Sequence, residues 1–170
     1  MEPITLHILG CGSAKPTLNH LPSAQILEMR GKYYMIDCGE SVQTTMQRMK
    51  LGMLKVGHIF ISHNHGDHVF GLPGLISTMA LLGRTAQLHI HGPKDLQEFL
   101  NITLKVYCEG MDYEVIFHPI RTHEHYIIYE DRSVEVWSIP MNHRVPCAGF
   151  LFKEKQALPH IKREMIEAFN

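Results

Sequence analysis

The stretch that most constrains this 170-residue chain is His63-Asn64-His65-Gly66-Asp67-His68, which carries four side chains able to bind a metal. The apolar run 59–61 comes before it and predicts a strand that stops at Ser62. The apolar segment 69–83 follows and predicts a helix. Open α/β sheets build their sites where strands end, so this strand, loop and helix predict a functional loop at a sheet edge.

The spacing within this motif favours a site for two metals. Residues two apart in extended backbone point the same way, so His63 and His65 can hold one ion. The chain can turn sharply at Gly66, which aims Asp67 and His68 at a second point, and the ions of two-metal hydrolytic sites lie roughly 3.5–4 Å apart. Imidazole and carboxylate ligands without thiolate favour zinc, with manganese or iron as alternatives. The competing interpretation is a histidine-rich surface turn, which suits one histidine better than several.

A third ligand for the first metal is expected from a distant part of the chain. A catalytic zinc takes three protein ligands and a water molecule. His143 follows the predicted strand 133–139 and is the best-placed partner for His63 and His65.

The ligand count for a second metal stays incomplete. Two metals need about seven or eight coordination positions, some of them filled by water. Asp67 and His68 are the only side chains that the sequence offers to the second ion. No residue after Asp67 is an obvious bridging carboxylate. The later aspartates lie at predicted helix starts or turns: Asp95, Asp112 and Asp131. Either the site is mononuclear, or further ligands lie beyond residue 170.

Composition is that of an ordinary globular domain. The chain is 45% hydrophobic and 19% charged with a formal net charge of −1, so its overall charge does not favour nucleic-acid binding, although a local basic patch is compatible with it.

The N-terminus lacks an apolar signal region, which predicts a cytoplasmic protein. The apolar run 69–83 is too short to cross a membrane, because a spanning helix needs about 20 residues. Four cysteines lack disulfide or zinc spacing and are interpreted as small buried residues: Cys11, Cys38, Cys108 and Cys147.

The remaining histidines give weaker signals. His89 and His91 alternate with apolar residues in a predicted strand and are interpreted as satisfied polar residues rather than functional ones. His118, His123 and His125 favour a solvated turn over a second metal site, because no pair among them follows a buried strand.

Strands are predicted over 4–9, 23–29, 32–36, 57–62, 87–91, 113–120, 125–129, 133–139 and 146–152. A helix is predicted to begin after the N-cap Ser41, with one apolar face formed by Val42, Met46, Met49 and Met53. Two more helices are predicted over 94–107 and 158–169.

The motif resembles the H-x-H-x-D-H signature of metallo-β-lactamase-fold hydrolases, and within them the chain resembles the tRNase Z (ribonuclease Z) family. The resemblance rests mainly on the block 62–74, S-H-N-H-G-D-H-V-F-G-L-P-G. It extends to segments in the same order along the chain: L-G-C-G-S at 9–13, I-D-C-G-E at 36–40 with Gln43, H-G-P at 91–93, and His143. The loop 15–23 departs from the family, since it lacks the basic Arg-Asn pair often found there.

The resemblance implies an αββα sandwich, an α/β fold in which residues 1–170 form the N-terminal portion of a single domain with a mixed sheet and flanking helices. It implies a zinc-dependent endoribonuclease that removes 3′ trailers from precursor tRNA, with two zinc ions in a complete site. In this scheme His63, His65 and His143 hold one zinc. Asp67 and His68 hold part of the other, and Asp67 also orients the attacking water and accepts its proton. Asp37 is expected to fix a ligand imidazole.

The resemblance also implies a homodimer. It further implies that this segment lacks metal ligands that members of the family carry later in their sequences. The chain alone is therefore expected to be poorly active. Two alternatives stay open. One is a hydrolase of a small phosphodiester or another ester on the same fold, and the other is a non-catalytic module that keeps a partial metal site.

Overall fold

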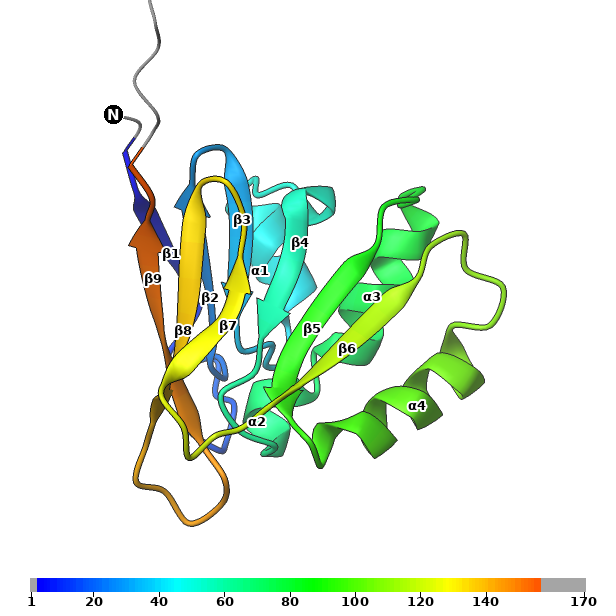
Figure 1. Cartoon of the computed structure of the whole chain (residues 1–170). Helices are drawn as coiled ribbons and strands as arrows, with labels where there is room; N and C mark the ends of the chain where they lie inside the picture. Colours follow the sequence, from blue (N-terminus) through cyan, green and yellow to red (C-terminus); the bar gives the residue numbers. More distant parts are fainter. Residues whose placement is uncertain (1–2, 157–170) are drawn as a thin grey trace, which may run out of the picture.

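Two sheets pack face to face in the computed structural model, which describes residues 3–156 (Figure 1). One is a six-stranded sheet with the order β1-β2-β3-β4-β5-β6, and the other is a three-stranded sheet with the order β7-β8-β9. The strands of the first sheet are β1 (Thr5–Gly10), β2 (Ala24–Met29), β3 (Lys32–Ile36), β4 (Val56–Phe60), β5 (Leu88–Pro93) and β6 (Val115–Ile120). The strands of the second are β7 (Tyr126–Glu130), β8 (Val134–Pro140) and β9 (Ala148–Glu154).

Helices cover one face of the larger sheet. They are α1 (Val42–Arg48), the 3-10 turn η1 (Met53–Lys55), α2 (Gly66–Val69), α3 (Leu72–Leu81) and α4 (Leu96–Tyr107). Side chains alternate along β4, so Ile59 packs in the core under the helices while Phe60 packs against the smaller sheet. In the part of the chain that the structure describes, this gives three layers: helices, mixed sheet and second sheet. The mixed sheet with flanking helices confirms the predicted fold class.

The strand directions place the functional loops together. β1, β2 and β3 pair antiparallel, whereas β3, β4, β5 and β6 pair parallel. The carboxyl ends of the parallel strands therefore meet at one edge, where the motif 63–68 follows β4. The predicted strands 23–29 and 32–36 form a hairpin of β2 and β3, and its turn contains Gly31 with a φ of 71°.

The helix predicted over 69–83 is in fact two helices. Pro73 lacks a backbone N–H and is tolerated only in the first turn of a helix, so α3 begins at Leu72 and α2 ends before it. Gly71, at the join, donates its N–H to the Cys38 carbonyl at 2.8 Å. A Cβ at Gly71 would lie 2.2 Å from the Gly39 carbonyl oxygen, so the backbones of these two glycines meet closely beneath the motif.

Replacement of Gly71 by alanine is expected to destabilise the fold by about 1–3 kcal/mol, because backbone must move to admit the methyl group. Gly57 in β4 is the matched control, since a Cβ there meets nothing within 4 Å. Urea unfolding of Gly71→Ala, Gly57→Ala and the parent chain measures the difference. Equal stability of the two variants would contradict the close approach seen at Gly71.

Other sequence expectations need smaller corrections. Ser41 does precede α1, but it adopts a φ of 68° and its side chain makes no capping hydrogen bond. In the methionine stripe Met46 and Met53 are buried, whereas Met49 is exposed because α1 ends at Arg48. Cys11 is exposed and Cys147 is half-buried, contrary to the interpretation of every cysteine as buried. The helix predicted over 158–169 lies outside the described residues.

Four histidines form a ladder on the face of the larger sheet opposite the helices. His58 in β4 pairs in register with His89 in β5, and His91 in β5 pairs with His118 in β6. The ring nitrogens of His58 and His91 lie 3.2 Å apart, and those of His89 and His118 lie 3.0 Å apart. The His91 ring stacks on Phe60 at 4.6 Å between centroids, and its Nδ1 has no hydrogen-bond partner. His89 and His91 are thus packed within the ladder and not within the candidate metal site.

Because of the histidine ladder, we expect the free energy of unfolding to fall as the pH is lowered. Burial, reinforced by neighbouring histidines, lowers the pKa of His58 to about 4 and that of His91 to about 2. The unfolded chain, with histidine pKa near 6.5, therefore takes up protons first as the pH falls. Above pH 6.5 the free energy of unfolding is unaffected by this difference. Below pH 6.5 each buried histidine such as His91 is expected to lower it by roughly 1 kcal/mol per pH unit.

Denaturant unfolding between pH 7 and pH 4.5 tests this expectation. His91→Leu should show a shallower loss of stability in acid than the parent chain. The matched control is His123→Leu, because the His123 side chain is 80% exposed. A His91→Leu variant with the parent's pH dependence would contradict the role assigned to the buried imidazole.

An edge strand carries exposed apolar side chains. Leu6 and Ile8 of β1 are 55% and 48% exposed, and exposed apolar side chains on an edge strand favour self-association. The homodimer itself stays a prediction.

Within residues 3–156, none of the helices has the length and apolar character that crossing a membrane requires.

Candidate metal centre

Three histidines from two different loops converge at the carboxyl edge of the larger sheet. His63 and His65 belong to the loop between β4 and α2, and His143 belongs to the loop between β8 and β9. One ring nitrogen from each lies within 4.8 Å of the other two. The two sheets thus each contribute to the cluster, which depends on how they pack.

The geometry of this trio suits a zinc ion. His63 Nε2 and His65 Nδ1 lie 3.1 Å apart, close to the spacing of about 3.3 Å between nitrogens bound to one tetrahedral zinc at 2.0–2.1 Å. The His143 ring centroid lies 4.7 Å from that of His63 and 5.4 Å from that of His65. Burial, followed by the nearby His68, lowers the pKa of His63 to about 4, so at neutral pH this ring is in the unprotonated form that a metal requires.

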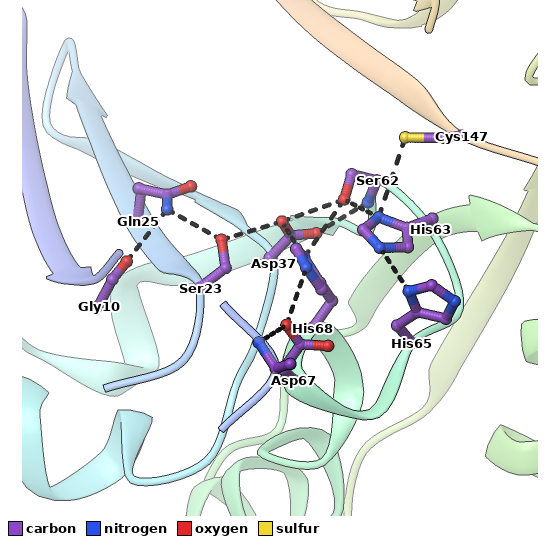
Figure 2. Close-up of polar contacts among 11 residues, drawn as sticks. Gly10, Ser23, Gln25, Asp37, Ser62, His63, His65, Asp67, His68 and Cys147 are labelled. Atoms are coloured by element: carbon purple, nitrogen blue, oxygen red, sulfur yellow. Dashed lines mark hydrogen bonds and ion pairs between the residues drawn. The ribbon is translucent and has the colours of Figure 1, made fainter. Parts of the chain in front are cut away.

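A buried carboxylate, Asp37, contacts several residues of the site (Figure 2). Asp37 follows β3 with a φ of 56°, a left-handed conformation that aspartate tolerates better than most residues. Its Oδ1 accepts from the Ser62 N–H at 2.8 Å, and its Oδ2 accepts from the hydroxyls of Ser62 and Ser23 at 3.1 and 3.2 Å. His68 Nδ1 lies 2.7 Å from the same Oδ2. The predicted contact between Asp37 and an imidazole of the motif is confirmed, and that imidazole is His68.

Asp67 and His68 lie beside the trio rather than within it. The Asp67 Oδ2 accepts the Ala14 N–H at 2.6 Å and lies 3.5 Å from His68 Nε2. Burial alone raises the pKa of Asp67, but the Ala14 hydrogen bond and the charge of His68 outweigh it and keep the pKa low. The Asp37 contact fixes His68 Nδ1, so His68 Nε2 and the Asp67 carboxylate face the same side, as a second ion would need.

Burial by itself lowers the pKa of His68. The hydrogen bond and charge of Asp37, together with the charge of Asp67, outweigh burial and raise it. Asp37 therefore holds the ring at Nδ1, while Nε2 lies 3.5 Å from the Asp67 Oδ2.

Three functional contacts were missed in the sequence. The Ser62 hydroxyl lies 3.0 Å from His63 Nδ1 and 3.4 Å from His68 Nδ1, so it links the two rings to Asp37. The Ala14 amide, 53 residues away along the chain, holds Asp67. The Cys147 sulfur lies 3.9 Å from His63 Nδ1. Only Ser62, next to the motif, carried a sequence signal that was available.

The residues considered for other metal roles do not join the cluster. No carboxylate within residues 3–156 completes a ligand group with the trio. Asp131, for example, is bound to Lys32 at 2.5 Å. His118 belongs to the histidine ladder and His125 contacts the Ser138 carbonyl at 3.0 Å, so the cluster of His118, His123 and His125 does not form a metal site.

The chain is similar to known proteins along nearly its full length. A family model described as Anti-Pycsar protein Apyc1 matches residues 4–159. A protein of Bacteroides thetaiotaomicron named ribonuclease Z is 53% identical over 99% of the chain, and one of Porphyromonas gingivalis with the same name is 50% identical over all of it. The chain covers 54% and 56% of these relatives, so it spans about half their length.

Solved structures share the fold. Human tRNase Z, short form, superposes with a TM-score of 0.79 at 29% identity, covering 88% of this chain and 64% of the human one. The metallo-β-lactamase fold protein YhfI from Bacillus subtilis superposes with a TM-score of 0.69 at 18% identity, covering 89% of this chain and 59% of its own, which supports the fold alone. These similarities confirm the resemblance to tRNase Z, whereas the Apyc1 description was not predicted.

Proposed function

The chain belongs to the family whose model is described as Anti-Pycsar protein Apyc1, which matches residues 4–159. Because relatives that are 50–53% identical to it are named ribonuclease Z, we propose that the chain is part of a zinc-dependent endoribonuclease that removes 3′ trailers from precursor tRNA. The observation that carries the proposal is the convergence of His63, His65 and His143 beside Asp67 and His68. These side chains provide nitrogen and carboxylate ligands around a point at the sheet edge, as metal-assisted phosphodiester hydrolysis requires.

His63, His65 and His143 are the residues that would hold the first zinc, and Asp67 and His68 part of a second. When bound, zinc supplies Lewis-acid chemistry, which polarises a phosphoryl oxygen and lowers the pKa of water. The protein's part is to fix the rings. Asp37 holds His68 at 2.7 Å and Ser62 holds His63 at 3.0 Å, and such partners set the tautomer and orientation of a ligand imidazole.

Asp67 has a separate role in this proposal. Its Oδ2 is held by the Ala14 amide at 2.6 Å, so the carboxylate keeps a fixed orientation. The low pKa of Asp67 leaves it ionised at neutral pH, where it accepts hydrogen bonds from water and can take a proton. We assign Asp67 the orientation of the attacking water and the acceptance of its proton.

Cleavage of a 3′-extended precursor tRNA tests the function. Because the chain spans about half the length of its relatives, a chimera is the decisive protein: this chain replaces the matching 54% of the Bacteroides thetaiotaomicron relative. The chimera, loaded with zinc, is expected to cut just after the discriminator nucleotide, as mapped with a 5′-labelled substrate. Residues 1–170 alone are expected to cut poorly, and an Asp67→Asn chimera serves as the matched inactive control.

The alternatives give different results in the same assay. A chimera that folds, binds zinc and cleaves a chromogenic phosphodiester but leaves precursor tRNA intact would replace the proposal by a small-phosphodiester hydrolase. A chain that folds normally but binds no zinc would indicate the non-catalytic module. Robust cleavage of precursor tRNA by residues 1–170 would contradict the expectation that ligands are incomplete in this segment.

A further inference from the structure

The second sheet is held to the first by a small apolar core. Its buried members are far fewer than those of the core under the helices and are Met29, Tyr34, Phe60, Val134 and Val136. Because apolar burial stabilises packing in proportion to the area covered, this core holds the second sheet more weakly than the larger core holds the helices. Within residues 3–156, the polar groups that border the small core therefore have a large influence on how firmly the second sheet is held.

The histidine ladder borders this core. His58 and His91 are the members that face β7, with ring centroids 4.0 and 5.9 Å from that of Tyr129. The His91 ring also stacks on Phe60 at 4.6 Å and is 2% exposed. His91 thus lies between the two sheets, where an imidazolium would have little water around it.

The ladder has no compensating carboxylate. Within the part of the chain that the structure describes, its rings form hydrogen bonds with one another and none with Asp or Glu. The charged and titratable groups that face the ladder are Lys32, Tyr34, Arg84, Glu114, Tyr129 and Asp131. Burial raises the pKa of both tyrosines, so they stay neutral, while the carboxylates and the cations shift the histidine pKa in opposite directions. An imidazolium in the ladder therefore lacks a partner that would offset its burial.

The packing of the second sheet decides the position of His143. This member of the zinc trio belongs to the loop between β8 and β9, whereas His63 and His65 follow β4 of the first sheet. Beside the trio, the Ala148 N–H at the start of β9 donates to the Ser62 carbonyl at 3.0 Å. This hydrogen bond crosses between the sheets, so it reports whether they are packed together at the metal centre.

We propose that the histidine ladder is a pH-sensitive latch whose protonation loosens the second sheet and withdraws His143 from the metal centre. When the second sheet moves away, His58 and His91 are exposed to water, which stabilises their protonated form. In the packed state burial lowers both pKa values below 6.5, so this state binds fewer protons. Packing of the sheets is therefore favoured above pH 6.5 and weakens as the pH falls. The inference goes beyond the proposed function, because it needs the trio as the zinc site but does not need RNA as the substrate.

Hydrogen exchange of the metal-free chain, followed by NMR between pH 7 and pH 5, tests the latch. The Ala148 amide is the reporter, and the reference is the Ile61 amide, which donates to the His91 carbonyl at 2.7 Å within the first sheet. Separation of the sheets opens Ala148 without unfolding the first sheet, so its protection factor should be at least tenfold below that of Ile61. The protection factor of Ala148 should fall about 20-fold or more over this range, because one proton taken up on separation shifts the equilibrium tenfold per pH unit below pH 6.5.

Removal of the imidazoles should remove this pH dependence. In His58→Gln/His91→Leu the protection factor of Ala148 is expected to fall less than about fivefold over the same range, because neither new side chain takes up a proton. The matched control is His123→Leu, at a side chain that is 80% exposed, and it should behave as the parent chain does. His58→Gln alone keeps a hydrogen-bonding group beside His91 and is the second variant if the double one is unstable. It should reduce the fall at least about twofold.

Two results would overturn the latch. Equal protection of Ala148 and Ile61 at every pH would mean that the sheets separate only when the whole chain unfolds. A pH dependence in the double variant like that of the parent would mean that the ladder does not control the packing of the second sheet.

Zinc should close the latch, because the trio spans both sheets. At pH 6 and a free zinc concentration 100 times the Kd, the protection factor of Ala148 is expected to rise about 100-fold. This rise should be lost in His143→Ala and kept in His123→Leu. An Ala148 amide that does not respond to zinc in the parent chain would overturn the link between the latch and the metal centre. If Ala148 responds to pH and zinc but the chimera leaves precursor tRNA uncut, the latch stands and the assigned reaction falls.

Discussion

Replacement of His63 by alanine is expected to lower the zinc affinity of the chain by roughly 100-fold or more, because even residues that only support a metal ligand cost 10–100-fold when removed. His63 is the most buried of the converging trio, at 7% exposure, and its ring lies within 5 Å of those of His65, His68 and His143. Competition with a fluorescent zinc chelator measures the affinity directly, without any need for activity.

His123→Ala is the control for this prediction, because His123 is exposed and does not belong to the trio. It should bind zinc as the parent chain does. Similar affinities for the His63→Ala variant and the parent would mean that zinc binds elsewhere, and the metal centre would have to be reassigned. His143→Ala should reproduce the loss seen at His63, which tests whether the second sheet supplies a ligand.

The second large effect is expected at Asp37, where alanine should lower the free energy of unfolding by about 2–4 kcal/mol. The substitution leaves the Ser62 N–H and the Ser23 hydroxyl without their acceptor and removes the partner of His68. Alanine also tolerates the φ of 56° less well than aspartate does. Chemical denaturation of the metal-free variant and parent at pH 7 gives the difference.

Asp37→Asn separates the causes. Asparagine also accepts the left-handed conformation and keeps one oxygen for the Ser62 N–H, so its loss of stability should be smaller than that of alanine. It removes the charge that orients His68, however, so its zinc affinity should still fall about 10–100-fold. Parent-like stability in Asp37→Ala would contradict the role of this carboxylate as the organiser of the site.

The sequence predicted the parts of the site that depend on local spacing. His63 and His65 are two residues apart after a strand, so they had to point the same way, and His143 follows a strand of the second sheet. The contact of Asp37 with an imidazole of the motif was also expected, as part of what the resemblance implies. The fold class came from the resemblance of the motif and the segments around it to a known family.

The remaining features depend on tertiary packing that no local pattern records. The Ala14 amide reaches Asp67 only because the loop after β1 folds over α2. The histidine ladder needs the register of β4, β5 and β6, which sets His58 beside His89 and His91 beside His118. The break at Gly71 did carry a local signal in Pro73, but the apolar pattern of the segment outweighed it in the prediction.

Zinc K-edge X-ray absorption of the zinc-loaded chain tests the central claim most directly, because it counts the groups bound to the ion. The structure predicts imidazole scattering from His63, His65 and His143, with nitrogen and oxygen neighbours at about 2.0–2.1 Å. The imidazole signal should weaken in His143→Ala. A sulfur neighbour at about 2.3 Å, as Cys147 would supply, or an imidazole signal unchanged by His143→Ala, would contradict the proposed metal centre.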